Sequence, residues 1–197
     1  MKPLLLIVSA PSGAGKTTLC DMLLQAYPEF EYSVSCTTRE PRFTEEDGVD
    51  YHFLSVARFK ELLSKNSFLE HAEVHGNFYG TLKEPVETAL KQGQCVLLDI
   101  DVEGAAQVRS AVAAMPADSI MRQGYLDIFI NPPSLEALRE RLEGRGTDSQ
   151  EVIEKRLENA QIEMERASEY MFRETNDDLR ICFKRLCDII NVKGEIS

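Results

Sequence analysis

The sequence contains no tryptophan, only three histidines and no apolar run close to the roughly 20 residues that a membrane-spanning helix needs. The five cysteines are scattered without a C-x-x-C pair, a pattern that favours free thiols in a reducing compartment over a disulfide framework. None of the histidines stands with Cys or carboxylates at metal-ligand spacing. We therefore expect a cytoplasmic protein without a membrane segment and without a His/Cys metal centre.

Positive charge is also scarce. Lys and Arg number 22 against 33 Asp and Glu, a net charge of −11. A broad nucleic-acid-binding surface is excluded, because such surfaces need many Lys and Arg contacts with phosphates. Two local basic clusters nevertheless occur, at Arg39–Arg42 and Arg139–Arg145. Basic clusters in an acidic background indicate that the protein binds a small anion and not a polyanion.

The hydrophobic pattern predicts an α/β fold. Leu4–Val8 is a continuous apolar run, typical of a strand buried on both faces, and a glycine loop and a helix over Thr17–Tyr27 follow it. Strand, glycine loop and helix form the usual opening of a parallel sheet flanked by helices. The same pattern predicts two more strands and two more helices, the last with Ser134 as N-cap: Cys95–Ile100, Leu126–Ile130, Val102–Ala113 and Ser134–Glu143.

The length of 197 residues suits one domain with mobile parts. Residues 32–83 have short β-type segments, many turn residues and one helix near Val56–Leu63, which predicts an inserted α+β subdomain. We expect residues 134–168 to form a helical lid, because the pattern predicts a charged, largely exposed helix over Thr147–Ser168 after the hinge Gly144-Arg145-Gly146. The core is then the rest of the chain: 1–31, 84–133 and 169–197.

The loop after the first strand carries a phosphate-binding motif. Ala10-Pro11-Ser12-Gly13-Ala14-Gly15-Lys16-Thr17 matches G-x-x-x-x-G-K-[ST] at every fixed position but the first, where Ala replaces Gly. The glycines let successive N–H groups point at phosphate oxygens, and the following helix adds the positive end of its dipole. Lys16 would contact the β- and γ-phosphates and the Thr17 hydroxyl would bind Mg²⁺. The alternative is a glycine-rich turn that only caps a helix. The position of the motif between a buried strand and a helix argues against this alternative.

Asp99 ends the apolar run of the second predicted strand. In a phosphate-loop fold a carboxylate there commonly contributes to the Mg²⁺ shell, often through water. The alternative is a carboxylate that caps the next helix.

A second anion site is predicted within residues 32–83. Arg39 and Arg42 flank Pro41, which stiffens the segment and can present two guanidinium forks to one phosphate. Tyr51 and Tyr79 add neutral donors. This combination favours a phosphomonoester pocket; the alternative is a set of solvated turn charges.

Several motifs then recur in order along the chain. S-x-S-x-T-T-R-x-P-R, D-Y-x-F, E-x-A-x-x-x-G-N-x-Y-G-[ST], L-D-I-D-x-x-G, R-L-x-x-R-G and N-D-D-L stand at Ser33–Arg42, Asp50–Phe53, Glu70–Thr81, Leu98–Gly104, Arg141–Gly146 and Asn176–Leu179. In these motifs, and over nearly its whole length, the chain resembles the guanylate kinases. The resemblance implies transfer of the γ-phosphoryl group of ATP to GMP, with Mg²⁺.

The resemblance also implies roles for single residues. Those that match the GMP phosphate contacts are Arg39, Arg42, Tyr51 and Tyr79, and those that match the guanine contacts are Ser35, Glu70, Thr81 and Asp101. The ATP contacts match Ala10, Pro11, Ser12, Gly13, Ala14, Gly15, Lys16, Thr17, Thr18 and, at the adenine, Asn176. The catalytic set matches Lys16, Arg39, Arg141, Arg145 and Arg156, and Mg²⁺ falls to Thr17 and Asp99. The expected partners are ATP, GMP and dGMP, without nucleic acid or membrane; the oligomeric state stays open.

Hydrogen-bond chemistry supports guanine as the base. Its N1–H and N2–H₂ are adjacent donors that one carboxylate such as Glu70 can accept, while a hydroxyl such as Ser35 can donate to O6. Adenine would set an unprotonated N1 against that carboxylate, so discrimination of about 10⁴-fold is expected in a desolvated site. Rival interpretations are a kinase for AMP, UMP or dTMP, and a phosphopeptide-binding module, whose phosphate loop would be degraded.

Four departures from the family pattern stand out. Ala10 replaces Gly, and Thr44 stands where Gly is common. Met115–Gly124 is longer than the usual connection, and we interpret it as a surface-loop insertion. Phe172–Thr175 lacks the apolar run expected of a last core strand, which bears on the placement of Asn176 next to it.

Overall fold

The computed structural model describes residues 1–144, 146 and 148–196. Its larger sheet has five parallel strands in the order β2 (Phe30–Tyr32), β7 (Cys95–Asp99), β1 (Leu5–Ser9), β8 (Tyr125–Asn131) and β9 (Phe172–Thr175). The central β1 is completely buried, and its Ile7 lies opposite Leu98 of β7 and Asp127 of β8. The predicted parallel sheet flanked by helices is confirmed.

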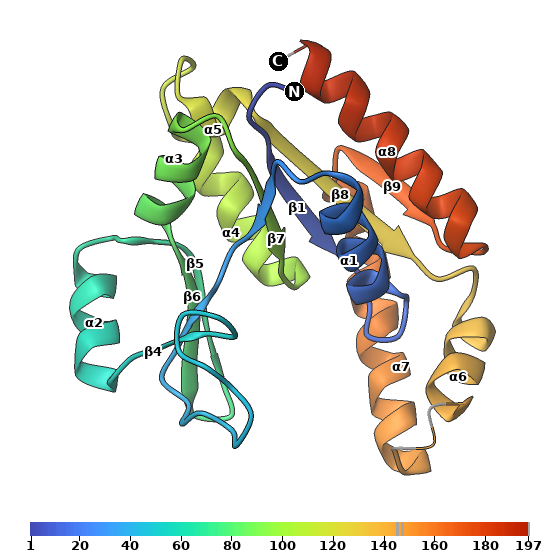
Figure 1. Cartoon of the computed structure of the whole chain (residues 1–197). Coiled ribbons are helices and arrows are strands. Elements are labelled where there is room, and N and C mark those ends of the chain that lie inside the picture. The colour runs from blue at the N-terminus through green and yellow to red at the C-terminus, as the bar shows by residue number, and fades with distance from the viewer. Residues whose placement is uncertain (145, 147, 197) are drawn as a thin grey trace.

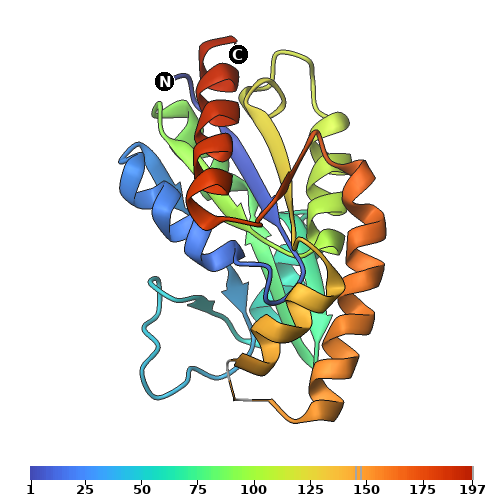
Figure 2. The same cartoon turned by 90° about the vertical axis from the view of Figure 1, so that its right-hand side faces the viewer.

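Helices cover both faces of this sheet because its strands are apolar on both sides. Leu4, Leu6 and Val8 pack with α1 (Lys16–Ala26) and α8 (Leu179–Ile196). Leu5 and Ile7 face the opposite layer, which contains α3 (Lys83–Lys91), α4 (Val102–Ala113) and α5 (Ile120–Gln123). Figures 1 and 2 show the two layers, with both chain ends at the same end of the molecule.

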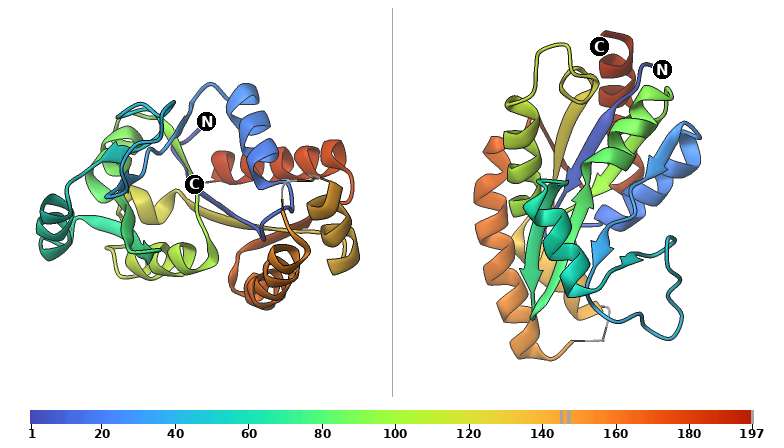
Figure 3. Two further views of the ribbon diagram at one scale, coloured as in Figure 1. Left: turned by 90° about the horizontal axis from the view of Figure 1, so that it is seen from below. Right: turned by 90° about the vertical axis from the view of Figure 1, so that its left-hand side faces the viewer.

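A smaller sheet forms a separate unit within residues 32–83. Its strand order is β4 (His52–Phe53), β3 (Cys36–Thr37), β6 (Asn77–Leu82) and β5 (Phe68–Val74). Helix α2 (Val56–Ser64) packs on it through Phe59, whose ring stacks on those of Phe68 and Phe78. Figure 3 shows this sheet to one side of the larger one. Tyr32, the first residue of the predicted subdomain, belongs to β2 of the larger sheet and pairs with Leu97.

The predicted lid segment is a helix pair with its own small core. Helices α6 (Leu135–Gly144) and α7 (Gln150–Glu165), followed by the short 3₁₀ helix η1 (Arg166–Glu169), make up residues 135–169 apart from the connection. Ser134 caps α6 by accepting a hydrogen bond from the Ala137 N–H at 3.1 Å, as predicted. Most of α7 is exposed, and its buried residues meet those of α6: Ile153, Leu157 and Ala160 against Leu138 and Leu142. Arg145 and Thr147 lie outside the described residues.

Two sequence expectations need correction. Met115–Gly124 is not simply a surface loop: it contains α5, whose Met121 is buried in the core, and the Gly124 carbonyl accepts a hydrogen bond from Leu5 N–H at 2.9 Å. Phe172–Thr175 does form the last strand, β9, paired with β8. It needs no apolar run because it is an edge strand that pairs on one side and is partly exposed.

Within the described residues, no helix combines the length and apolar character that a membrane crossing requires. All five cysteines are free thiols, and four of them are buried.

Candidate active site

The phosphate loop joins the carboxyl end of β1 to the first turn of α1. Gly13 and Gly15 have φ values of +96° and +98°, a conformation that favours glycine, so their positions in the motif are explained by the backbone. Ala10 is not among the described non-glycine residues with positive φ, and alanine is therefore tolerated there. Residues of this loop line one pocket, which we call the donor pocket: Ala10, Pro11, Ser12, Gly13, Gly15, Lys16, Thr17 and Thr18, with Asp101 and Glu163.

A second pocket, which we call the acceptor pocket, opens beside it. Ser35, Tyr51, Glu70 and Tyr79 line it from the smaller sheet, and Asp99, Ile100 and Asp101 line it from the end of β7. Asp101 lines both pockets. The two pockets therefore adjoin at Asp101.

Lys16 lies at the junction of the two pockets. Its ammonium group forms an ion pair with Asp99 and donates to the Ile100 carbonyl at 3.4 Å, and both of these residues line the acceptor pocket. The lysine of the donor pocket is thus held by the strand end that borders the acceptor. A positive charge is thereby placed between the two pockets.

The floor of the acceptor pocket is built around Glu70. Glu70 is 8% exposed as a residue, and its carboxylate accepts a hydrogen bond from the Thr81 hydroxyl at 2.6 Å. Burial, followed by the nearby charge of Asp101, raises the pKa of Glu70 above its usual range, while Thr81 opposes this shift. Gly104 permits the close packing, because a Cβ there would stand 3.2 Å from Glu70 Oε2. Its N–H donates to Asp101 Oδ1 at 2.8 Å, so Asp101 also caps α4.

The two arginines predicted for the acceptor phosphate differ. Both terminal nitrogens of Arg39 donate to the Glu45 carboxylate, at 3.0 and 2.9 Å, and the guanidinium carbon lies 5.5 Å from the centre of the Tyr51 ring. Arg42 is exposed and donates only its backbone N–H to Glu45, at 2.8 Å. The fork of Arg39 thus holds a carboxylate in this structure, whereas the guanidinium of Arg42 is exposed.

Two arginines of the predicted lid contact the phosphate loop and are not among the residues that line the donor pocket. Arg156 of α7 lies 3.5 Å from the Ser12 hydroxyl and forms an ion pair with Asp148 at 3.3 Å. Arg141 of α6 donates to the backbone carbonyls of Ala14 and, at 2.7 Å, of Asn176. Arg145, the remaining predicted lid arginine, lies outside the described residues.

Sequence reasoning gave no role to two acidic residues that the structure brings to the site. Glu45 holds Arg39, as described above. Glu163 of α7 lines the donor pocket, and burial together with the nearby Asp101 raises its pKa. A signal for Glu163 existed: it stands seven residues after Arg156, a spacing that puts both side chains on one face of a helix.

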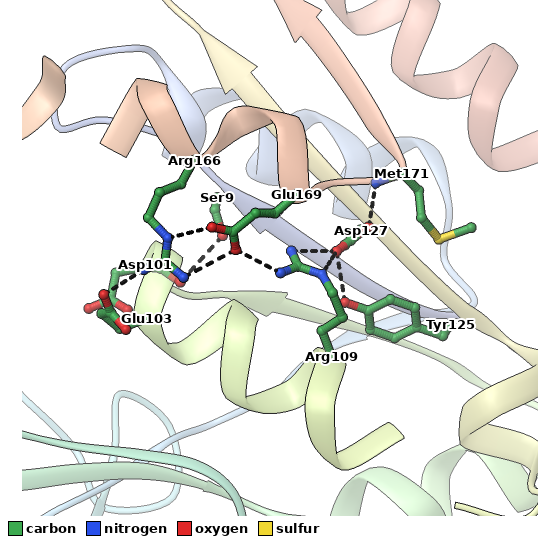
Figure 4. Close-up of polar contacts among 9 residues, drawn as sticks. All are labelled: Ser9, Asp101, Glu103, Arg109, Tyr125, Asp127, Arg166, Glu169 and Met171. Atoms are coloured by element: carbon green, nitrogen blue, oxygen red, sulfur yellow. Dashed lines mark hydrogen bonds and ion pairs between the residues drawn. The ribbon is translucent and has the colours of Figure 1, made fainter. Parts of the chain in front are cut away.

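A further network at the end of the lid was also missed. The carboxylate of Asp127, completely buried in β8, accepts hydrogen bonds from Arg109, the Tyr125 hydroxyl and the Met171 N–H. Arg109 also binds Glu169, which binds Arg166, and Arg166 reaches Glu103 at the start of α4 (Figure 4). The network ties η1, at the end of the lid, to β8 and α4. Its signal in the sequence was a single carboxylate inside an otherwise apolar strand.

The described residues contain no cluster of three or more His, Cys, Asp or Glu side chains able to hold a metal ion. Thr17 and Asp99 remain as the predicted oxygen donors; Thr17 lines the donor pocket, and Asp99 is paired with Lys16 in the neighbouring pocket. Oxygen donors suit Mg²⁺, which keeps several waters and takes few protein ligands, so this set fits the predicted ion.

Comparisons with known proteins point to one family. A family model described as guanylate kinase matches residues 2–193. The guanylate kinase of Alkalilimnicola ehrlichii is 50% identical over 174 residues, covering 88% of this chain and 81% of that protein. The guanylate kinase of Dechloromonas aromatica is 45% identical over 190 residues, with 96% and 89% covered. The crystal structure of guanylate kinase from Anaplasma phagocytophilum superposes with a TM-score of 0.71 at 31% identity, covering 98% of this chain and 86% of that one.

Proposed function

The chain belongs to the guanylate kinase family and is a nucleoside monophosphate kinase, and we propose from this premise how its residues transfer the γ-phosphoryl group of ATP to GMP. ATP occupies the donor pocket and GMP the acceptor pocket. The observation that carries the assignment is the shared wall: Asp101 lines both pockets and Lys16 lies at their junction.

Phosphoryl transfer needs positioning and charge neutralisation more than covalent chemistry. The N–H groups of the loop and the Lys16 ammonium would bind the β- and γ-phosphates of ATP. Mg²⁺, held by the Thr17 hydroxyl and through water by Asp99, would neutralise charge on the phosphate oxygens. No general base is required, because the GMP phosphate is already ionised near neutral pH.

The acceptor pocket would hold GMP at both ends. Glu70 accepts from guanine N1–H and N2–H₂, with Ser35, Thr81 and Asp101 completing the base site. Arg39 and Arg42, together with the hydroxyls of Tyr51 and Tyr79, hold the phosphate. The ribose 2′-hydroxyl is not part of this set, and dGMP is expected to be accepted too.

Closure would complete the site. We propose residues 32–83 as the acceptor subdomain and residues 134–168 as a lid that brings Arg141, Arg145 and Arg156 to the transferring group. The small sheet and the α6–α7 pair extend from the same end of the larger sheet, on either side of the phosphate loop (Figure 1). The cytoplasm, where ATP and GMP are both present, is the proposed location.

One assay tests the assignment. Purified protein with ATP and Mg²⁺ is offered GMP, dGMP, AMP, UMP and dTMP in turn, and ADP release is followed by a coupled reaction. We expect turnover with GMP and dGMP and at least about 10³-fold lower kcat/KM with the others. Equal rates with AMP and GMP would contradict the proposed recognition of guanine. Turnover should also require added Mg²⁺, and activity without it would contradict the proposed metal.

A further inference from the structure

Asn176 was predicted to contact adenine, but it lies under the phosphate loop. The residue is 4% exposed, and it is not among the residues that line the donor pocket. The side-chain amide donates to the Ala14 carbonyl at 2.8 Å, and the backbone N–H of Asn176 donates to the Asn131 carbonyl at 2.8 Å. Asn176 is therefore fixed to the end of β8 and holds the loop from the side opposite its ligand.

Through the peptide bond between Ala14 and Gly15, this contact also sets the direction of the Gly15 N–H. In a trans peptide the C=O and the next N–H point in opposite directions, and the described residues contain no cis peptide. With the Ala14 oxygen turned towards Asn176, the Gly15 N–H is turned away from it. Gly15 lines the donor pocket, and its N–H donates to no backbone carbonyl in the described part of the chain.

Two neighbours make the contact specific. Arg141 also donates to the Ala14 carbonyl, at 3.5 Å, and to the backbone carbonyl of Asn176 at 2.7 Å, so the lid helix α6 supports the same peptide. Gly15 leaves room for the amide, since a Cβ at that position would stand 2.3 Å from Asn176 Nδ2. The glycine of the motif is thus required by the asparagine as well as by its own φ of +98°.

We propose that Asn176 is a positioning residue for the phosphate loop: it holds the Ala14–Gly15 peptide so that the Gly15 N–H faces the donor polyphosphate. It acts on the phosphates of the donor through the loop, and its effect does not depend on the adenine base. The inference rests on the proposed assignment of ATP to the donor pocket.

The test distinguishes an effect of Asn176 on phosphate binding from an effect on adenine binding. Wild-type protein, Asn176→Ala and the control Asn191→Ala are assayed at saturating GMP, with inorganic tripolyphosphate as a competitive inhibitor against MgATP. Asn191 is an exposed asparagine on α8 that accepts a hydrogen bond from Tyr27, and its loss removes an amide of the same kind away from the loop.

In Asn176→Ala we expect the KM for MgATP and the Ki of tripolyphosphate to rise by the same factor, about ten-fold, because a buried carbonyl loses its main donor. Asn191→Ala should change neither value. A rise in KM with an unchanged Ki would overturn the proposal in favour of a contact with adenine. Unchanged values for both would overturn it as well. If tripolyphosphate does not compete with ATP in the wild-type protein, the donor-pocket assignment itself is wrong.

A measurement on the wild-type protein covers the case in which Asn176→Ala fails to fold. Amide NMR spectra are recorded with tripolyphosphate and with ADP. The Gly15 N–H signal should move downfield with both ligands, and the Asn176 side-chain NH₂ signals should move equally with both. A shift of the Asn176 signals with ADP alone, or a Gly15 signal that responds to neither ligand, contradicts the proposal.

Discussion

The donor and acceptor pockets are built in opposite ways. The donor pocket is mostly one continuous segment, residues 10–18, whose glycines shape the backbone at the end of the larger sheet. The acceptor pocket is assembled from side chains on β5, β6, the segments before β3 and β4, and the end of β7. A backbone site binds phosphate whatever is attached to it, whereas a side-chain site can distinguish one base from another.

The charged groups also take their partners from different places. Lys16 of the donor pocket pairs with Asp99, which stands at the end of β7 and lines the neighbouring pocket. On the acceptor side the partners come from the smaller unit itself, since Arg39 pairs with Glu45 and Glu70 accepts a hydrogen bond from Thr81. Donor-side changes should therefore affect turnover, and acceptor-side changes should affect which nucleotide is used and at what concentration.

Lys16→Met gives the largest expected effect. Removing the Lys16 ammonium group should lower kcat about 10⁴-fold. Enzymes lose this much turnover when they lose a positive side chain that stabilises the transferring phosphoryl group. The preference for GMP over AMP should stay the same, because the acceptor pairs are intact. Steady-state turnover with both nucleotides measures this. A decrease of less than about 100-fold would contradict the role of Lys16.

Asp127→Ala tests the stability that the buried network between η1, β8 and α4 contributes. Arg109, Tyr125 and the Met171 N–H would all lose their acceptor, so the free energy of unfolding should fall by about 4 kcal/mol. The control is Asp188→Ala, which removes an exposed i,i+4 pair with Lys184 and should cost less than about 0.5 kcal/mol. Urea unfolding measures the free energy of unfolding of both variants. Equal decreases would show that the buried network stabilises the fold no more than an exposed ion pair does.

Glu70→Gln should reduce the preference for GMP over AMP more than it reduces kcat with GMP. A neutral amide can accept only one of the two guanine donors, so the ratio of kcat/KM for GMP to that for AMP should fall about 100-fold. Glu73→Gln, on the same strand β5 but exposed, is the matched control and should leave the ratio unchanged. A larger loss in kcat at saturating GMP than in the ratio would place Glu70 in catalysis and not in recognition.

The pH dependence of kcat/KM for GMP should also reflect the Glu70 carboxyl. Burial raises the pKa of Glu70, so on acidification it takes up a proton at a higher pH than an exposed glutamate would. The protonated form cannot accept both guanine donors, and kcat/KM for GMP should fall about ten-fold per pH unit below that pKa. Glu70→Gln should lack this acid limb and keep the one that belongs to the GMP phosphate. Identical profiles for the two proteins would contradict the assignment.

Glu45→Gln gives the smallest expected effect. Glu45 keeps the Arg39 guanidinium beside Tyr51, and its pKa is lowered by that arginine, so the pair is ionised at neutral pH. Without the charge we expect the KM for GMP to rise about five-fold with kcat nearly constant. Glu46→Gln makes the same charge change one residue away and serves as the control. A lower KM would mean that Glu45 competes with the GMP phosphate for Arg39.

Much of this arrangement could be predicted from the sequence. The phosphate loop, the buried strands and helix α4 depend on local patterns, such as glycine spacing and apolar runs, and these hold whatever surrounds them. The errors occurred where context decides. Met121 is buried because α5 packs under α3, and β9 is a strand because β8 offers it an edge.

The amino-acid sequence by itself determined the fold class, the phosphate loop and the family, because each rests on residues close together in the chain or on motifs in a set order. Only the tertiary structure decided which partners the charged groups take. Arg39 binds Glu45, Asn176 supports Ala14, and Asp127 collects three donors from separate elements. Most of these partners stand on segments that only folding brings together, and neither composition nor spacing records the distance between them.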